Sequence, residues 1–312
     1  MKAIVINQYG GKDVLQESEL EKPAIGDDQV LVEVHATSIN PIDWKLREGY
    51  LKEMLPFEFP IILGWDVAGI IADTGKNVDS FKKGDRVFAR PATTNRGTYA
   101  EYTAVDAHLL AKMPDEMSYA DAAAIPLAGL TAWQCLVDFG KVKQGEKVLI
   151  HAGAGGVGIY AIQIAKSFGA EVVTTASEKN IEFLKSLGAD RVINYKEEDF
   201  SEILQDVDFV LDSIGGDVQT SSYKVLKKNG KLVSIVSPPD EEEAKKHNVN
   251  AGFLWLEPNG EQLKKLADAY SAGNLKPVIG STFKLGEEAI QEAHALSETH
   301  HARGKIVILV KE

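Results

Sequence analysis

Apolar and polar residues alternate in two different ways along the chain. Up to about residue 115, short apolar runs separated by Gly and Pro predict a β-rich region. From about Ser118, helical patterns alternate with short apolar strands, which is typical of a parallel, doubly wound sheet. After residue 259 this alternation stops, and two helical patterns precede a final strand at Lys305–Val310. We therefore expect residues 118–259 to form a domain inserted into a first domain made of residues 1–117 and 260–312.

The expected strands are all short. In the first domain they are Ala3–Ile6, Val30–His35, Val67–Ala72, Arg86–Ala89 and Tyr99–Val105. Such strands, punctuated by turns, predict a barrel-like or sandwich-like domain. In the inserted domain they are Val148–Ile150, Val172–Thr175, Arg191–Ile193, Phe209–Leu211 and Leu232–Val236. The last helical patterns are Gln262–Ala272 and the stretch from Ala289 to Leu296.

A glycine-rich turn joins the first strand of the inserted domain to the helix after it. Gly153, Gly155 and Gly158 reproduce the pattern G-x-G-x-x-G, with Gly156 and Val157 between them. The first glycine allows a tight turn, the second lets the backbone approach a pyrophosphate, and the third lets helix and strand pack closely. Backbone N–H groups at the start of the helix then face the phosphates. This strand, turn, helix and strand order predicts a dinucleotide-binding unit.

Composition excludes several classes of protein. The 312 residues carry a formal net charge of -12, which argues against nucleic acid or an anionic membrane as a partner. No apolar stretch approaches a membrane-spanning length, and the first residues lack the apolar core of a signal peptide. The single cysteine, Cys135, excludes an intramolecular disulfide and lies in an apolar run, where we expect an inert buried thiol. We expect a cytoplasmic protein.

The end of the second inserted strand bears on the choice of nicotinamide cofactor. An NAD-preferring site usually has an acidic residue there, about 20 positions after the glycine turn, but this chain has Ala176. Ser177 and Lys179 can donate hydrogen bonds to the 2′-phosphate of NADPH. Glu178 is the opposing feature, since it could turn inward and favour NAD. The balance predicts NADPH.

Several segments together match one family. They are Ser38–Asp43, Gly64–Phe88, Gly97–Tyr102, Leu127–Ala132, His151–Gly158, Gly188–Asp190 and Gly304–Lys305. On these residues the chain resembles the medium-chain dehydrogenase/reductase superfamily, in its zinc-free quinone oxidoreductase branch. The resemblance implies a doubly wound parallel Rossmann sheet inserted into a GroES-like β-barrel catalytic domain. It also implies an enzyme that is often a homodimer paired through an edge of the cofactor-domain sheet, here the run Leu232–Val236 or the residues just after it.

The chain departs from the zinc-dependent members of that family at each ligand position. Asn40 stands in place of the first cysteine, and Trp65 followed by Asp66 replaces the histidine and glutamate. The third ligand, a cysteine near Leu127, and the four-cysteine lobe are also missing. Catalytic zinc needs about three protein ligands, so we expect no metal site. Without a Lewis acid, the feasible reaction is hydride delivery from NADPH to a quinone or an α,β-unsaturated carbonyl.

The resemblance assigns roles to further residues. Asn40 and Thr131 are expected near the nicotinamide or the acceptor's carbonyl oxygen, although Asn40 is also a suitable turn residue before Pro41 and Thr131 an ordinary helix position. Asp43 could orient a neighbouring group or relay a proton, but a local hydrogen bond or a pairing with Arg47 is the favoured role. No side chain stands out as an obligatory acid, so water or a ribose hydroxyl is the expected proton source.

Two further groups of candidates complete the expected site. Trp44, Tyr50 and Trp65 would line a surface for a flat apolar acceptor, or else pack in the core. On the cofactor side, the resemblance adds Tyr195 as a phosphate contact. The ends of the fourth and fifth inserted strands add Gly215 and Ser237. The resemblance also implies that the backbone of Phe253–Leu256 runs beside the nicotinamide amide.

Two alternatives stay open. The first is an alcohol or aldehyde dehydrogenase of the same superfamily that uses a metal on unconventional ligands such as Asp66 and Asp43. The second is a non-catalytic protein that binds NADPH. His294, His300 and His301 could suggest a metal site, but adjacent histidines at a helix end more often lie in solvent, and no carboxylate or cysteine converges on them in sequence.

Overall fold

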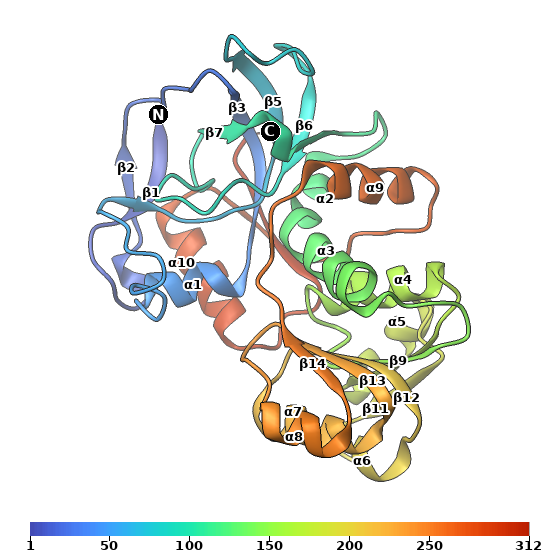
Figure 1. Ribbon diagram of the computed structural model, residues 1–312. Coiled ribbons are helices and arrows are strands. Elements are labelled where there is room, and N and C mark those ends of the chain that lie inside the picture. The colour runs from blue at the N-terminus through green and yellow to red at the C-terminus, as the bar shows by residue number, and fades with distance from the viewer. Residues whose placement is uncertain (312) are drawn as a thin grey trace. The chain divides into compact units, whose positions relative to one another are not determined.

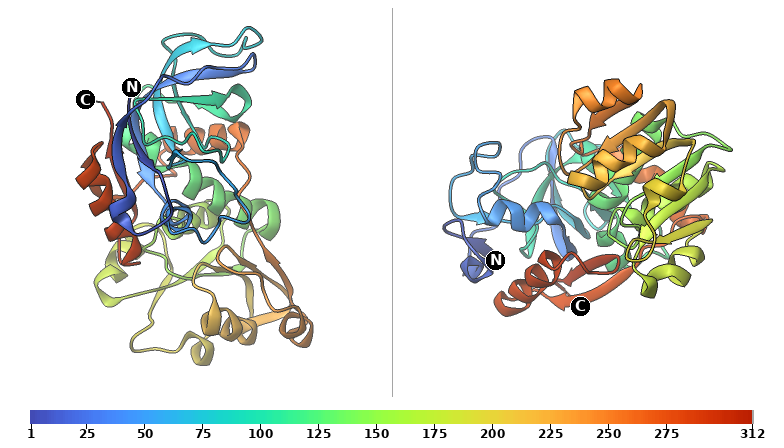
Figure 2. Two further views of the ribbon diagram at one scale, coloured as in Figure 1. Left: turned by 90° about the vertical axis from the view of Figure 1, so that its left-hand side faces the viewer. Right: turned by 90° about the horizontal axis from the view of Figure 1, so that it is seen from below.

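The computed structural model describes residues 1–311, which form two compact units. Unit 1 comprises Met1–Leu130, Pro258–Gly273 and the stretch from Pro277 to the end of the described chain. Unit 2 comprises Thr131–Glu257 and Asn274–Lys276. Figures 1 and 2 show both labelled chain ends in unit 1, so unit 2 is an insertion, as the change in pattern predicts.

The first boundary differs from the predicted one at residue 117. Helix α2 (Tyr119–Ala124) packs against strands β3, β5 and β16 of unit 1, and α3 (Pro126–Trp133) crosses the boundary. The change to helical texture therefore begins about a dozen residues before the change of unit. The physical reason is that the alanines of α2 are buried against the first unit's sheet.

Unit 1 contains two β-sheets. One has the order β2-β1-β4, from Gln16–Glu19, Lys2–Ile6 and Ile61–Ile62. The other has the order β15-β16-β3-β5-β6-β8, with β7 also paired to β3. Its strands are β3 (Gln29–Ile39), β5 (Val67–Thr74), β6 (Arg86–Ala89), β7 (Tyr102–Asp106), β8 (Leu110–Lys112), β15 (Ile279–Lys284) and β16 (Lys305–Leu309).

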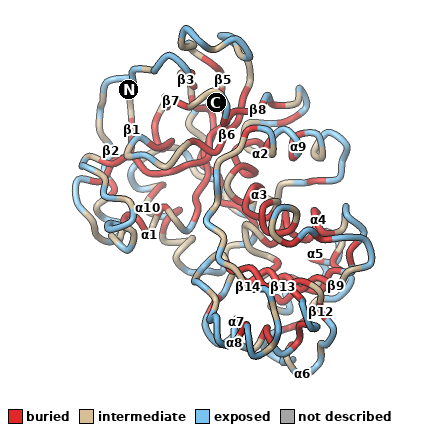
Figure 3. Tube along the Cα trace, viewed as in Figure 1, coloured by how far each residue is buried: buried red, intermediate tan, exposed pale blue. Residues whose placement is uncertain are grey.

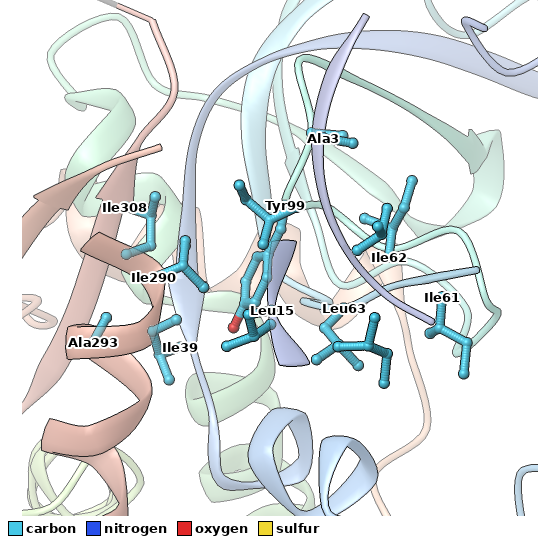
Figure 4. Packing of buried hydrophobic residues seen from close by; sticks show 14 of the residues in the cluster. Ala3, Leu15, Ile39, Ile61, Ile62, Leu63, Tyr99, Ile290, Ala293 and Ile308 are labelled. Atoms are coloured by element: carbon cyan, nitrogen blue, oxygen red, sulfur yellow. The ribbon is translucent and has the colours of Figure 1, made fainter. Parts of the chain in front are cut away.

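The predicted return of the C-terminal segment to the first unit is seen in strand β16, which pairs antiparallel with β3. Strand β15 was not predicted, because its side chains alternate between half-buried and exposed and only Pro277–Ile279 had an apolar pattern. Strand β7 begins at Tyr102, not at Tyr99, since Tyr99 leaves the ladder and is fully buried. Figure 4 shows the Tyr99 ring among Leu15, Ile39 and Ile290 in the core of this unit.

The helices of unit 1 hold the site residues described below. They are α1 (Pro41–Arg47), α2, most of α3, α9 (Gly260–Ser271) and α10 (Glu287–Glu298), with short helices η1 (Lys12–Val14) and η2 (Ala107–Leu109). Helix α1 begins directly after the long strand β3, where Asn40 is extended and Pro41 fixes the first helical turn.

Unit 2 is a six-stranded parallel sheet with the order β11-β10-β9-β12-β13-β14. The strands are β9 (Lys147–Ile150), β10 (Glu171–Ala176), β11 (Arg191–Asn194), β12 (Val207–Asp212), β13 (Leu226–Ser234) and β14 (Asn250–Phe253). Numbered from the first strand, this is the 3-2-1-4-5-6 order of a doubly wound dinucleotide-binding fold, so that prediction is confirmed. Figure 3 draws much of the central sheet as buried.

In unit 2 one helix precedes β9 and the others lie between successive strands. They are η3 (Gln134–Gly140), α4 (Gly158–Ser167), η4 (Glu178–Asn180), α5 (Ile181–Ser186), α6 (Phe200–Ile203), α7 (Gly216–Val225) and α8 (Glu241–His247). Strand β13 ends at Ser234 and pairs with the unpredicted strand β14. Because β14 begins at Asn250 and ends the sheet order, the prediction that placed the edge at Leu232–Val236 or the residues just after it was wrong.

Candidate functional site

The turn between β9 and α4 brings all the predicted glycines together. A Cβ at Gly153 would lie 2.1 Å from Thr174 Oγ1 on β10, and a Cβ at Gly158 would lie 2.6 Å from the carbonyl oxygen of Ala152. Close packing on the neighbouring strand is thus the task of Gly153, while Gly158 closes the turn on itself. Gly155 is different, because its added Cβ would approach only the Ala152 oxygen, at 3.2 Å.

The turn leaves backbone donors available. Gly153 donates to Thr175 and Gly155 donates to Ala152, but the amides of Gly156 and Val157 have no acceptor within residues 1–311. Unbonded N–H groups at the first turn of a helix form a binding site for phosphate. The residues therefore fit the pyrophosphate of a dinucleotide.

The side chains of Thr175 and His151, which were not among the residues predicted for the site, support this turn. Ala152 has a φ of 51°, and its amide donates to Thr175 Oγ1 at 3.1 Å. His151 lies 3.3 Å from the same oxygen through Nδ1 and 2.9 Å from Ser222 Oγ through Nε2. Burial lowers the pKa of His151 to about 4, so the ring is neutral at pH 7. The position of His151, between the strand and the first glycine, is the feature of the sequence that could have identified it.

The residues predicted to face a 2′-phosphate gather at the end of β10. Ala176 is buried there, and its carbonyl oxygen accepts from the amide of Tyr195 at 3.3 Å. Ser177 directly precedes η4, and its Oγ accepts from Asn180 Nδ2 at 3.4 Å. Lys179 is exposed in that short helix. The structure thus brings Ser177 and Tyr195 to the two sides of Ala176, with no carboxylate at position 176.

The second half of the sheet joins Gly215 to Ser237. Asp212 Oδ1 accepts from the amides of Ile214 and Gly215, and Asp212 Oδ2 accepts from Gln219 Nε2 at 2.9 Å. Gln219 also donates to the carbonyl oxygen of Ser237 at 3.3 Å. Sequence reasoning missed Asp212 and Gln219, which order this loop. An aspartate ending a buried strand was the signal for the first of them.

In unit 1, Asn40 belongs to a buried polar cluster. Its Nδ2 donates to Asp66 Oδ2 at 2.7 Å, and its Oδ1 accepts from Lys305 Nζ. Asp66 also accepts from Ser38 Oγ at 2.5 Å and from the amide of Leu127 at 2.7 Å. The structure therefore places Asn40 both at the head of α1, as a turn residue, and in contact with two charged groups. Its exposed fraction is 2%.

Asp43 makes the local hydrogen bonds expected of it. Its Oδ2 accepts from the amide of Asn40 at 2.8 Å and from the Tyr99 hydroxyl at 2.7 Å. The expected pairing with Arg47 was wrong, because Arg47 instead contacts Glu48, Glu298 and His294. Burial raises the pKa of Asp43 to about 7, against the lowering effect of these hydrogen bonds.

We expect Asp43→Asn to weaken the pH dependence of the free energy of unfolding between about pH 4 and pH 7. Because the folded pKa lies above the unfolded value of 3.8, the native carboxyl keeps a proton that the unfolded chain loses. Asp43 therefore reduces stability as pH rises from about 4 to about 7, with no further loss above that range. Each pKa unit corresponds to about 1.4 kcal/mol, so the full difference between the folded and unfolded pKa of Asp43 sets the upper limit of this loss of stability. We expect a smaller loss of roughly 2 kcal/mol, because water that enters the structure partly solvates the buried carboxylate.

The measurement is the free energy of unfolding in urea for wild type and Asp43→Asn between pH 4 and pH 8. Lowered pKa values of His151 (about 4) and His294 (about 3) act in the opposite direction, so the difference between the two proteins is the quantity to follow. Exposed Asp79→Asn serves as the control. Parallel curves for wild type and Asp43→Asn would contradict the expectation.

The three aromatic candidates lie in different environments. Trp65 is completely buried in the core cluster of unit 1 with Leu63 and Tyr99, so its core role replaces the substrate-lining role proposed from the sequence. Trp44 is half-buried, with its ring 6.4 Å from that of exposed Tyr50 and 5.9 Å from that of His300. Trp44 and Tyr50 therefore lie beside each other, with their rings nearly perpendicular.

The remaining candidates lie as follows. Thr131 is buried in α3 and is the first residue of unit 2, and Cys135 is buried, with its thiol pKa raised by desolvation. Phe253–Leu256 contains the end of β14, where Phe253 is partly exposed. His300 and His301 are exposed, whereas His294 is enclosed between Arg47 and Tyr99.

Among residues 1–311, no group of three or more His, Cys, Asp or Glu side chains lies where it could hold a metal ion. None of the described helices is long and apolar enough to cross a membrane.

Family models match three parts of the chain. A model described as an alcohol dehydrogenase GroES-like domain matches residues 26–115, and one described as a zinc-binding dehydrogenase matches residues 187–308. A third, the C-terminal domain of alanine dehydrogenase/PNT, matches residues 133–218. The first match confirms the GroES-like expectation for unit 1.

Whole-chain relatives agree with these matches. An NADPH-dependent alkenal/one oxidoreductase of Arabidopsis thaliana is 38% identical over 99% of this chain and 79% of its own length. Among solved structures, a quinone oxidoreductase from Coxiella burnetii is 40% identical, covers 100% of this chain and 99% of its own, and has a TM-score of 0.94. The Escherichia coli quinone oxidoreductase complexed with NADPH is 29% identical, with coverage of 99% and 100% and a TM-score of 0.90.

Proposed function

Because this chain belongs to the medium-chain dehydrogenase/reductase superfamily, among relatives named as quinone and alkenal oxidoreductases, we propose that it is an NADPH-dependent reductase of quinones or α,β-unsaturated carbonyls. The observation that carries the proposal is the glycine turn at the head of α4, with the unbonded amides of Gly156 and Val157. When bound, NADPH supplies the hydride. The chain binds and orients the reactants and stabilises the charge that develops on the acceptor's oxygen.

The cofactor-binding residues all belong to unit 2. Gly153, Gly155, Gly156, Val157 and Gly158 form the pyrophosphate turn. The 2′-phosphate accepts hydrogen bonds from Ser177, Lys179 and Tyr195. The nicotinamide ribose lies against Gly215 and Ser237, which follow β12 and β13. The absence of a carboxylate at Ala176 supports NADPH over NADH, because a carboxylate there would repel the phosphate.

We expect Lys179→Ala to weaken NADPH binding about tenfold and to leave NADH binding within twofold. The reason is the loss of one charge-assisted hydrogen bond to a phosphate that only NADPH carries. Lys185→Ala is the matched control, since Lys185 is an exposed helical lysine that pairs with Glu182. Titration of cofactor fluorescence measures both affinities. Equal losses for the two cofactors, or tighter wild-type binding of NADH than NADPH, would overturn the assignment.

In unit 1, we assign the acceptor's oxygen to the amide of Asn40 and its flat body to Trp44 and Tyr50. Asn40 carries a second Nδ2 hydrogen that has no partner within residues 1–311. An N–H donor stabilises the enolate or phenolate oxygen that forms as hydride reaches the conjugated carbon. Thr131, the first residue of unit 2, is assigned to the nicotinamide. The product's proton comes from water or a ribose hydroxyl.

The zinc implied by one matching family model does not fit the residues present. Zinc is held by thiolate, imidazole or carboxylate donors, whereas Asn40 supplies an amide and Trp65 an enclosed indole. Both oxygens of Asp66 already accept hydrogen bonds. We therefore propose a zinc-independent reaction. Elemental analysis should find well under one zinc per active chain, and stoichiometric zinc in active protein would overturn this point.

The proposed activity is tested by NADPH oxidation with methyl vinyl ketone and p-benzoquinone, compared with saturated ketones and with alcohols plus NADP⁺. Turnover confined to the conjugated acceptors supports the proposal. Demonstrated NADPH binding without turnover of any acceptor would overturn it.

We also propose a homodimer paired through the free edge of β14. Sedimentation of wild type compared with a Gly252→Pro variant tests this pairing.

A further inference from the structure

Lys305 is a buried lysine whose contacts all converge on one place. It begins strand β16 and is 3% exposed. Its Nζ donates to the carbonyl oxygen of Ile39 at 3.2 Å and to Asn40 Oδ1, and it lies 3.5 Å from Asp66 Oδ2. The ammonium group is therefore directed to the end of β3, to the residue that precedes α1, and to Asp66, which precedes β5.

These contacts fix the orientation of the Asn40 amide. A lysine ammonium can only donate, so the amide atom that faces Lys305 must be oxygen. An ionised carboxylate can only accept, so the amide atom that faces Asp66 must be nitrogen. Asn40 therefore cannot flip without losing both bonds, and its second Nδ2 hydrogen is the donor left for a further partner.

Two opposing effects act on the Lys305 amine. Desolvation lowers its pKa, while Asp66 and Asp43 favour its ammonium form. Both hydrogen bonds that Nζ makes, to the Ile39 carbonyl oxygen and to Asn40 Oδ1, are bonds to acceptors, as a donating ammonium group requires.

We propose that Lys305 and Asp66 are positioning residues that hold the side chain of Asn40 as a polarised N–H donor for the acceptor's oxygen. The inference rests on the proposed function, because it supplies the reason for the role of Asn40. In this proposal a buried lysine and a buried aspartate, rather than a metal ion, prepare the group that contacts the acceptor's oxygen. No bond is made or broken by Lys305 or Asp66.

A double-mutant cycle with Asn40→Ala tests the proposal. Lys305→Met should lower kcat with an enone at least about tenfold in the wild-type background, since an incorrectly oriented or weakly polarised donor loses transition-state stabilisation. In the Asn40→Ala background the same change should cost less than twofold, because Lys305 acts through Asn40. NADPH affinity should stay within twofold, and Lys305→Arg should recover part of kcat.

Controls separate this role from a purely structural one. Lys311→Met removes an exposed lysine that pairs with Glu33 just after the same strand, and it should leave kcat unchanged. If Lys305→Met fails to fold, the pair Asp66→Asn with Lys305→Met removes both charges together and should fold with the same loss of kcat. A full loss in both backgrounds, or wild-type kcat in a folded Lys305 variant, overturns the inference alone. Absence of wild-type turnover overturns it together with the proposed function.

Discussion

Replacing Gly155 by alanine is expected to weaken NADPH binding about 100-fold while the free protein keeps its stability. In the folded chain an added Cβ at Gly155 meets only the Ala152 oxygen, at 3.2 Å, and Gly155 has no left-handed backbone that would strain an alanine. The second glycine of such a turn is where the backbone approaches the pyrophosphate. A methyl group there displaces the phosphates from about two charge-assisted hydrogen bonds, which corresponds to roughly 3 kcal/mol.

Gly286→Ala is the matched control for this experiment. Gly286 has no atom within 4 Å of an added Cβ, has a φ of 176°, and belongs to unit 1, whereas the glycine turn belongs to unit 2. It should bind NADPH as wild type does. Calorimetric titration gives both affinities, and thermal unfolding without cofactor checks the fold. A Gly155→Ala protein that binds NADPH within twofold of wild type would exclude this turn as the pyrophosphate site.

Replacing Arg47 by methionine is expected to reduce the free energy of unfolding by about 3–5 kcal/mol, with NADPH affinity unchanged in the folded protein. Arg47 is fully buried in unit 1, where Nε donates to the Gly10 oxygen at 3.0 Å and Nη1 lies 2.7 Å from Glu298 Oε1. It thereby ties α1 to α10 and to the turn after β1. Methionine fills similar space but leaves these acceptors unpaired.

Arg191→Met gives the comparison for an exposed ion pair. Arg191 lies 3.3 Å from Glu198, and both side chains are more than two-fifths exposed, so we expect a change below about 1 kcal/mol. Urea unfolding followed by circular dichroism measures both variants. A loss of less than 1 kcal/mol for Arg47→Met would show that the buried contacts of α1 do not stabilise unit 1 as described.

The cofactor turn could be predicted because its determinants are local. Gly153 to Gly158 are consecutive in the chain, and their conformational requirements follow from residue type alone. The same holds for strands β9 to β12, whose buried faces give continuous apolar runs. Strand β14 was missed for the opposite reason. Its residues are half-buried or exposed at the edge of the sheet, so no apolar run marks it.

The cluster around Asn40 could not be predicted from local pattern. Lys305 and Asn40 are 265 positions apart, and lysine is almost never fully buried without a partner, so its partner must be known before its burial can be inferred. Trp65 shows the converse. Its position beside Asp66 suggested a site residue, but whether an indole lines a surface or packs in a core depends on neighbours from distant strands.

The most direct test of the account is the rate of NADPH oxidation with methyl vinyl ketone by protein treated with a chelator and shown to contain no zinc. We predict an undiminished rate, formation of the saturated ketone, and little or no turnover with NADH at the same concentration. Loss of activity on chelation that zinc restores, or the absence of NADPH-dependent reduction of any conjugated acceptor by folded, cofactor-binding protein, would contradict the account.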